Sequence, residues 1–250
     1  MKTKQYRILD APEAGDVFPV LLFAFPLFFT GTFMLTLMGT GLEDNHVALS
    51  WIDVGLHLLA MLVAVLPMRE YLSFSWLAVS GDNKARIPRC FWIGVAVLAY
   101  ATMLPQIPLP KFLEPYRWCS DSVMPLLTID LFNTSAYFVM ISPIVATICA
   151  VFVAPLVTCC MFYATVFVKG YNVRPWLGYL LLVPATVFIP ICTGVFGWWA
   201  PEGQFVMWAM RLPVHLLYCK LYEDTDNIWM PIFTQAAVNL IACLIVIFLW

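Results

Sequence analysis

The sequence is centred on the stretch Ala154-Pro-Leu-Val-Thr-Cys-Cys-Met-Phe-Tyr-Ala164. This stretch lies inside an apolar run from Thr134 to Val168, which exceeds the roughly 20 residues that one membrane-spanning helix needs. The run predicts either one long tilted helix, kinked at Pro143 or Pro155, or a helix that extends beyond the membrane. We therefore expect this stretch to form the middle of a membrane domain.

The composition excludes an ordinary soluble protein. Of the 250 residues, 62% are apolar and 11% are charged, whereas soluble domains are about half apolar and a quarter charged. The net charge is -2 and there is no basic stripe, so nothing indicates a nucleic-acid partner. We expect one integral membrane domain over 1–250, with N-terminal helices and loops in 1–133 and a core in 134–250.

The predicted fold class is an all-α polytopic membrane protein with six to seven transmembrane helices. The sixth segment decides between the two counts, because Arg211, His215 and Lys220 suit either a spanning helix or one at the membrane interface. The expected helices are Val17–Met38, Val47–Met68, Cys90–Leu104, one within Thr134–Val168, Trp176–Ala200, Gly203–Tyr222 and Met230–Trp250.

Segments in which basic residues cluster alternate along the chain with two other connections. They cluster at the N-terminus, in Arg69–Arg89 and in Lys169–Arg174, and these segments alternate with Gly39–His46 and Pro105–Asn133. The positive-inside rule therefore predicts a cytoplasmic N-terminus. The stretch Arg69–Arg89 is amphipathic, which favours a helix on the membrane surface over the segment that couples a permease to an ATPase.

Three segments of the C-terminal half share a pattern with one known family. These are Pro155–Tyr163, Phe188–Cys192 and Leu221–Asn239. They resemble the CPBP family, the CAAX-protease and bacteriocin-processing group of intramembrane proteases. Its members carry Glu-Glu-x-x-x-Arg, Phe-x-x-x-His and His-x-x-x-Asn or Asp in the corresponding helices, and these residues activate the water that cleaves a peptide bond.

The chain departs from that pattern at nearly every catalytic position. Thr158 and Cys159 take the places of the two glutamates, Tyr163 that of the arginine, Cys192 and Gln235 those of the two histidines, and Asn239 alone is retained. The resemblance thus implies a CPBP-like helical bundle in the C-terminal half whose central helices surround a cavity, in a degenerate member without catalytic residues. It also implies an integral protein of a bacterial plasma membrane.

If the resemblance holds, these six positions should converge, and their chemistry then has two interpretations. The first is an uncharged, hydrogen-bonded patch that ties helices together. The second is a new site, in which Cys159 and Cys192 form a thiol pair or a soft-metal site, or in which one of them is a nucleophile. Because no histidine lies in the three segments, the first interpretation is favoured, and no metal or cofactor is predicted.

Four ionisable residues are candidates for binding. Asp53 and His57 are four residues apart, as are Arg211 and His215, so each pair shares one helix face. Such groups are costly in lipid unless they are paired or face a cavity. Asp53 and His57 fit a local ion pair better than a proton path. Arg211 fits pairing with Asp53, an anionic headgroup or a substrate carboxylate, and a structural or lipid role is favoured for it.

These observations favour a pseudoprotease, a protein that is not an enzyme. It would bind transmembrane or lipidated peptide segments, or serve as a subunit of a membrane complex, with membrane lipid as its other partner. One alternative is the permease subunit of an ABC-type exporter, with six spanning helices. The other is an active intramembrane protease or CAAX-type endopeptidase that uses non-standard residues, with Cys159 or Cys160 as nucleophile.

Overall fold

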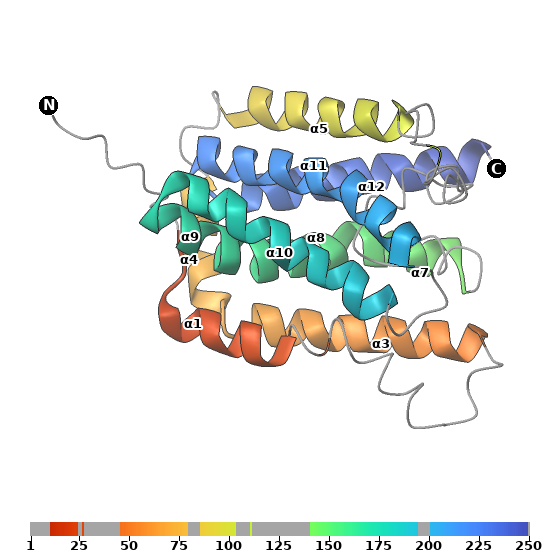
Figure 1. Ribbon diagram of the computed structural model, residues 1–250, viewed down its shortest axis with the longest axis horizontal. Coiled ribbons are helices and arrows are strands. Elements are labelled where there is room, and N and C mark those ends of the chain that lie inside the picture. The colour runs from red at the N-terminus through yellow and green to blue at the C-terminus, as the bar shows by residue number, and fades with distance from the viewer. Residues whose placement is uncertain are drawn as a thin grey trace, which may run out of the picture.

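Every regular element in the described part of the computed structural model is a helix (Figure 1). The structure describes residues 11–24, 27, 46–79, 86–103, 111, 141–194 and 201–249, without the side chains of 46, 49, 53, 187–194, 201–210 and 249. The helices are α1 (Ala14–Pro19), α3 (His46–Val65), α4 (Arg69–Val79), α5 (Arg86–Met103), α7 (Pro143–Ile148), α8 (Ala154–Thr158), α9 (Val168–Val173), α10 (Pro175–Gly194), α11 (Pro201–Thr225) and α12 (Trp229–Leu249). The all-α prediction is confirmed for these residues.

The central run forms one helix of 31 residues, from Pro143 to Val173. It begins at Ser142, whose hydroxyl accepts a hydrogen bond of 3.2 Å from the amide of Ile144, with Pro143 in the first turn. Serine before the helix and proline at its first position are both favourable, so Pro143 starts the helix and does not kink it. The helix ends before Arg174, which is extended, as a residue that precedes a proline tends to be.

Pro155 lies within this helix, between two π-helical segments, Cys149–Val153 and Cys159–Phe167. A proline inside a helix lacks the amide hydrogen that would bond to the preceding turn, and its ring crowds that turn. A π-helical turn holds an extra residue and so relieves such a conflict. Local widening of the helix thus takes the place of the sharp kink considered from the sequence.

The middle of this helix is enclosed on all sides. Every residue from Cys159 to Ala164 is 0% exposed, which is expected of a helix that is apolar all round. It lies between α3 on one side and α11 and α12 on the other, and α8 contacts both α3 and α12 (Figure 1). The stretch that organises the sequence is therefore the core of the bundle.

Two of the described helices are long and apolar enough to cross a membrane, Pro143–Val173 and Trp229–Phe248. A third span is possible if Ser50–Val65 and Arg69–Val79, which are bent by 77° relative to each other, count as one. These helices are compatible with a membrane protein. They do not confirm six to seven spans, and the first expected helix, Val17–Met38, lies partly outside the described residues.

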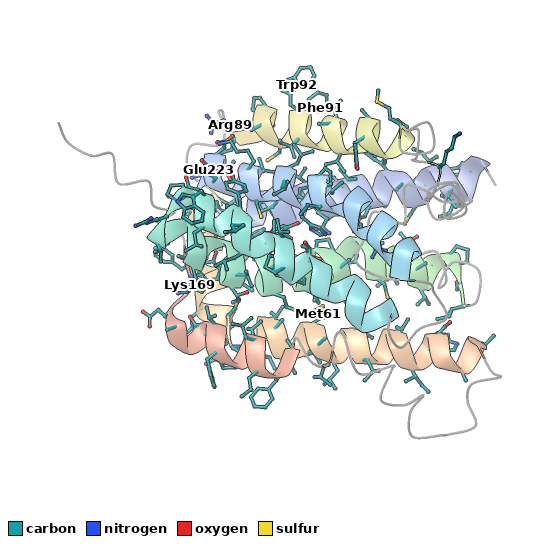
Figure 2. All side chains as sticks on the ribbon, in the orientation of Figure 1. Met61, Arg89, Phe91, Trp92, Lys169 and Glu223 are labelled. Atoms are coloured by element: carbon teal, nitrogen blue, oxygen red, sulfur yellow. The ribbon has the colours of Figure 1, made fainter. Side chains whose placement is uncertain are left out.

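Several basic segments lie at one end of the bundle, which we call the basic end. It comprises the turn from α3 to α4, the start of α5, the turn from α9 to α10 and the last turns of α11, which carry Arg or Lys, together with the start of α1 and the turn from α11 to α12, whose described charged residues are acidic (Figure 1). Arg89, Lys169 and Glu223 are labelled there (Figure 2). One expected boundary was wrong: α5 starts at Arg86 and not at Cys90, whereas α3 starts at His46, one residue before the expected Val47.

Candidate functional site

The motif positions with described side chains all lie in the interior. Thr158, Cys159 and Tyr163 are 0% exposed, and Gln235 and Asn239 are 4% and 8% exposed. The sixth position, Cys192, belongs to α10, but its side chain is outside the described part. The described positions come from the central helix and from α12, which contacts α8.

Gln235 and Asn239 join α12 to the central helix. They are four residues apart and therefore project from one face of α12. The thiol of Cys159 lies 4.0 Å from Oε1 of Gln235, a weak contact because sulfur is a poor donor. Asn239 donates a stronger hydrogen bond of 2.7 Å from Nδ2 to the carbonyl of Ala150. These two positions thus act in helix–helix contacts.

Tyr163 forms a buried hydrogen bond with His215, a residue that no motif includes. Its hydroxyl lies 2.8 Å from Nδ1 of the imidazole, and which atom donates depends on the tautomer. His215 is 2% exposed, and the Phe162 ring lies near it, with ring centroids 6.5 Å apart. From the sequence His215 was grouped only with Arg211. In the structure His215 contacts Tyr163, one of the motif positions. The two residues are 52 apart in the chain, so no local sequence pattern reveals this contact.

The other binding candidates lie on two helices. His57 is buried in α3 at 7% exposure, and Arg211 is half-buried in α11. The predicted pairings of Asp53, with His57 or with Arg211, fall on a side chain outside the described part. They remain predictions.

The described cysteines of the central helix and of α11 form no disulfide. Cys159 and Cys160 are free and fully buried, and so is Cys219 of α11. The suggested thiol pair of Cys159 with Cys192 falls on a side chain outside the described part. Among the residues searched, no group of three His, Cys, Asp or Glu side chains could hold a metal ion.

A polar network closes the basic end. Tyr179 of α10 donates a hydrogen bond to Glu223, and Lys220 forms ion pairs of 3.1 Å with Glu223 and 3.0 Å with Asp224. Burial alone raises the pKa of Glu223, but hydrogen bonds from Tyr179, Lys220 and Tyr171 outweigh it, so the pKa of this carboxyl lies below its ordinary value of 4.5. The network joins α10 to the end of α11.

The turn from α11 to α12 fastens α4 to the bundle. Asn227 donates a hydrogen bond of 2.9 Å from Nδ2 to the carbonyl of Ser75, and its Oδ1 accepts from the amide of Trp229 at 2.9 Å. The indole of Trp229 donates to the carbonyl of Leu72 at 2.9 Å. These bonds hold α4 across the basic end.

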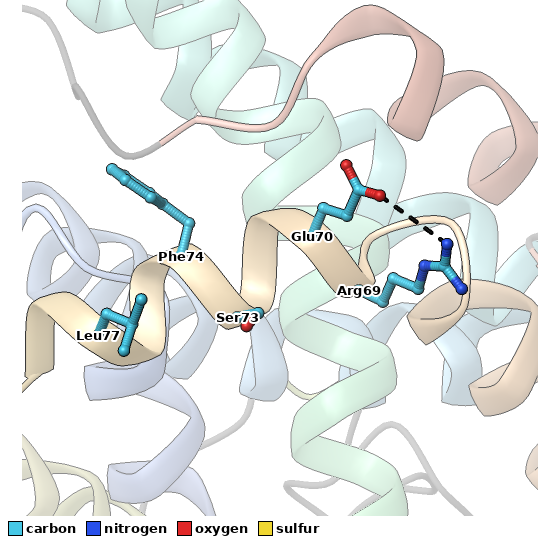
Figure 3. Close-up of a pocket in the computed structure, with 5 residues that line it drawn as sticks. All are labelled: Arg69, Glu70, Ser73, Phe74 and Leu77. Carbon is cyan, nitrogen blue, oxygen red and sulfur yellow. Dashed lines mark ion pairs between the residues drawn. The ribbon is translucent and has the colours of Figure 1, made fainter.

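A shallow pocket of about 550 Å³ lies on the outer side of α4 (Figure 3). All of its lining residues belong to this one helix, and its charged groups are the exposed pair Arg69 and Glu70, 3.8 Å apart. Phe74 and Leu77 form its apolar part and are 71% and 70% exposed. A depression on a single helix does not enclose a substrate, so it suits contact with lipid or with another protein better than catalysis.

No family model, no curated protein and no solved structure matches the chain. The resemblance to the CPBP family accordingly rests on the three quoted sequence segments.

Proposed function

We propose that the chain is a non-catalytic CPBP-like intramembrane protein that binds a transmembrane or lipidated segment of another protein, alone or as a subunit of a membrane complex. One observation carries the proposal: the positions that correspond to the catalytic residues and whose side chains the structure describes are uncharged and buried, and those of α12 contact the central helix. The side chains that would act in a protease serve here to hold the bundle together.

The chemistry of these contacts argues against hydrolysis. Activation of a water needs a general base within hydrogen-bond reach, and a cysteine nucleophile needs a neighbouring base or cation. The described contact of the Cys159 thiol is an amide oxygen of Gln235. The described imidazole of His215 is bonded to the hydroxyl of Tyr163. Neither of these described contacts is a pair that such a reaction requires.

Apolar side chains on the outside of the bundle supply the surface for a partner. Phe91 and Trp92 of α5 point outward and are 61% and 67% exposed (Figure 2). Aromatic side chains at such positions pack against lipid or against another transmembrane helix. We propose that a membrane segment of the partner lies along this side of the bundle.

Photo-crosslinking in proteoliposomes tests the proposal. A photoreactive phenylalanine analogue replaces Phe91, and the matched control carries it at Phe162, which is 0% exposed. We expect both a farnesylated peptide and a single-span peptide to crosslink at position 91 and not at position 162, and to remain uncleaved. Cleavage of either peptide contradicts the non-catalytic proposal, and equal crosslinking at both positions contradicts the binding surface.

The permease alternative has one observation in its favour. The helix α4 is bent by 77° from the preceding helix and lies across the basic end, as a coupling segment would. Stable co-purification with a nucleotide-binding subunit, lost when Phe74 and Leu77 are replaced by Ser, would support that function. The active-protease alternative instead requires that a measured activity disappears in Cys159→Ala or Cys160→Ala.

A further inference from the structure

Two buried polar atoms stand out within the described part of the chain. They are Oγ1 of Thr158 and Nε2 of His215, and neither has a hydrogen-bond partner there. Both residues are at least nine-tenths buried, at 0% and 2% exposure. Buried polar groups are nearly always hydrogen-bonded, so each such atom needs an explanation.

Thr158 differs from the other threonines of the bundle. A threonine in a helix can satisfy its hydroxyl by bonding to a carbonyl of the preceding turn. Every other threonine with a described side chain does so, and Thr158 does not, although the carbonyl of Ala154 lies one turn back. The bonded hydroxyls and their carbonyls are Thr102 to Ala99, Thr147 to Pro143, Thr165 to Met161, Thr186 to Leu182, Thr225 to Leu221 and Thr234 to Met230.

His215 has one nitrogen engaged and one unpartnered. When Tyr163 donates to Nδ1, Nε2 carries a hydrogen and needs an acceptor; when Nδ1 donates to Tyr163, Nε2 has a lone pair and needs a donor. A group that both donates and accepts satisfies either tautomer. The hydroxyl of Thr158 has the same two requirements.

These requirements define the chemistry of an occupant. A charged group is disfavoured, because charge is costly in the interior of a membrane protein and Thr158 offers no compensating charge. A neutral O–H group is small and can donate and accept at once. We propose that the interior of this bundle binds neutral O–H groups at Oγ1 of Thr158 and Nε2 of His215, supplied by water or by the hydroxyl of a lipid.

The inference is independent of the proposed function. It makes the interior a hydrated polar site, whether or not a partner segment binds to the outside. It also needs no catalysis, since neither Thr158 nor His215 contacts a described carboxylate that could activate a bound water.

The sign of a stability change tests the site at Thr158. Thr158→Val keeps the shape of the side chain and removes the hydroxyl. If an O–H group is bound there, we expect the thermal midpoint of the protein in micelles to fall by about 2–4 °C. Thr165→Val is the matched control, since that hydroxyl is bonded to the carbonyl of Met161, and we expect a smaller change. An unchanged or raised midpoint for Thr158→Val overturns the proposal at this atom.

The unmodified protein gives a second measurement, which holds even if the variant fails to fold. The chain has 3 histidines, so ¹⁵N-histidine spectra are simple, and the His215 signals are assigned by their loss in His215→Asn. We expect Nε2 to show the shift of a hydrogen-bonded nitrogen and to change in D₂O. A shift typical of a free nitrogen overturns the proposal at His215.

The choice of detergent distinguishes water from a lipid hydroxyl as the source of the bound O–H group. Lauryldimethylamine oxide has no hydroxyl group, so a bonded Nε2 in this detergent, after removal of lipid, identifies water. A bonded signal that appears only after phosphatidylglycerol is added identifies the lipid hydroxyl.

Discussion

Tyr163 and His215 join the central helix to α11 deep inside the bundle. Their hydrogen bond of 2.8 Å is surrounded by rings, with the Tyr218 ring centroid 6.5 Å from that of Tyr163. In such surroundings an unsatisfied polar atom is costly, so the loss of this bond destabilises the partner that remains. The pair therefore contributes to stability mainly because each residue satisfies the other.

We predict that Tyr163→Phe destabilises the fold by about 1–3 kcal/mol, since the variant removes the described partner of Nδ1 of His215. His215→Leu should be destabilising as well. In a double-mutant cycle measured by denaturant unfolding in micelles, the combined variant should lose less than the sum of the two. Additive losses would show that the two side chains do not interact.

The carboxyl group of Glu223, at the basic end, makes the stability of the fold depend on pH. Its pKa in the folded protein lies below the ordinary value of 4.5, so its contribution to stability is present above that pH and is lost as the pH falls through the folded pKa. We predict that Glu223→Gln flattens the loss of thermal midpoint in acid below about pH 4.5. Glu70→Gln is the control, since the Glu70 side chain is 86% exposed, and an equally flattened curve there would contradict the prediction.

At the scale of single residues, the sequence indicated which positions belong to the interior site, but it was less informative about which residues they contact. Thr158, Cys159 and Tyr163 were singled out as a group, and they are fully buried. The role of His215 was missed, because helical spacing relates a residue only to its neighbours on the same helix. Its contact with Tyr163 depends on how α11 packs against the central helix, which the spacing does not contain.

The helix α4 depends on the turn between α11 and α12. Asn227 donates a hydrogen bond to the carbonyl of Ser75 in the interior of α4 and accepts one from the amide of Trp229 at the start of α12. Asp226 has a positive φ of 49° beside it, which few residues other than glycine adopt easily. This turn therefore fixes both α12 and α4.

We predict that Asn227→Ala destabilises the protein by about 1–3 kcal/mol, because the buried hydrogen bond from Nδ2 of Asn227 to the carbonyl of Ser75 is lost. A spin label at Leu77 of α4 should also become more mobile. Asp226→Gly, one residue away, relieves the positive φ and should leave the label unchanged. Equal label mobility in Asn227→Ala and the unmodified protein would show that α4 is held by other contacts.

The α9–α10 contact depends on a close approach of two glycines. A Cβ at Gly178 would lie 2.7 Å from the carbonyl oxygen of Phe167, and a Cβ at Gly170 would lie 3.0 Å from Cα of Gly178. We predict that Gly178→Ala destabilises the fold by about 1–3 kcal/mol through overpacking. Gly55→Ala in α3 meets nothing within 4 Å and should be neutral or stabilising, as thermal unfolding of both variants would show.

The apolar runs of the sequence predicted the positions of the helices well. Local signals such as prolines and basic residues predicted the helix ends less well. The runs located α3, α10, α11 and α12 to within a few residues. The role of Pro143 was left open, because a proline fits either a helix start or a kink, and the cap at Ser142 decides it. The third helix was expected to begin at Cys90, yet Arg86 to Arg89 form the first turn of α5.

On the scale of the whole molecule, the position of charge suggests an orientation. The ends of α4, α5, α9 and α11 that carry basic residues meet at one end of the bundle, while α12 runs from there to the opposite end (Figure 1). Cytoplasmic loops are enriched in Lys and Arg, so the basic end should face the cytoplasm. The helix α12 is apolar enough to span, which would place its C-terminal end outside.

Cysteine labelling tests both statements at once. Leu77→Cys at the basic end and Phe248→Cys near the end of α12 occupy positions that are 70% and 79% exposed. With a membrane-impermeant maleimide, we expect Phe248→Cys to react in intact spheroplasts of a bacterial host and Leu77→Cys only in inverted vesicles. The unmodified protein, whose described cysteines are buried or half-buried, gives the background. Reaction of both sites from one side would mean that α12 does not cross the membrane, and the reverse pattern would mean that the basic end faces outward.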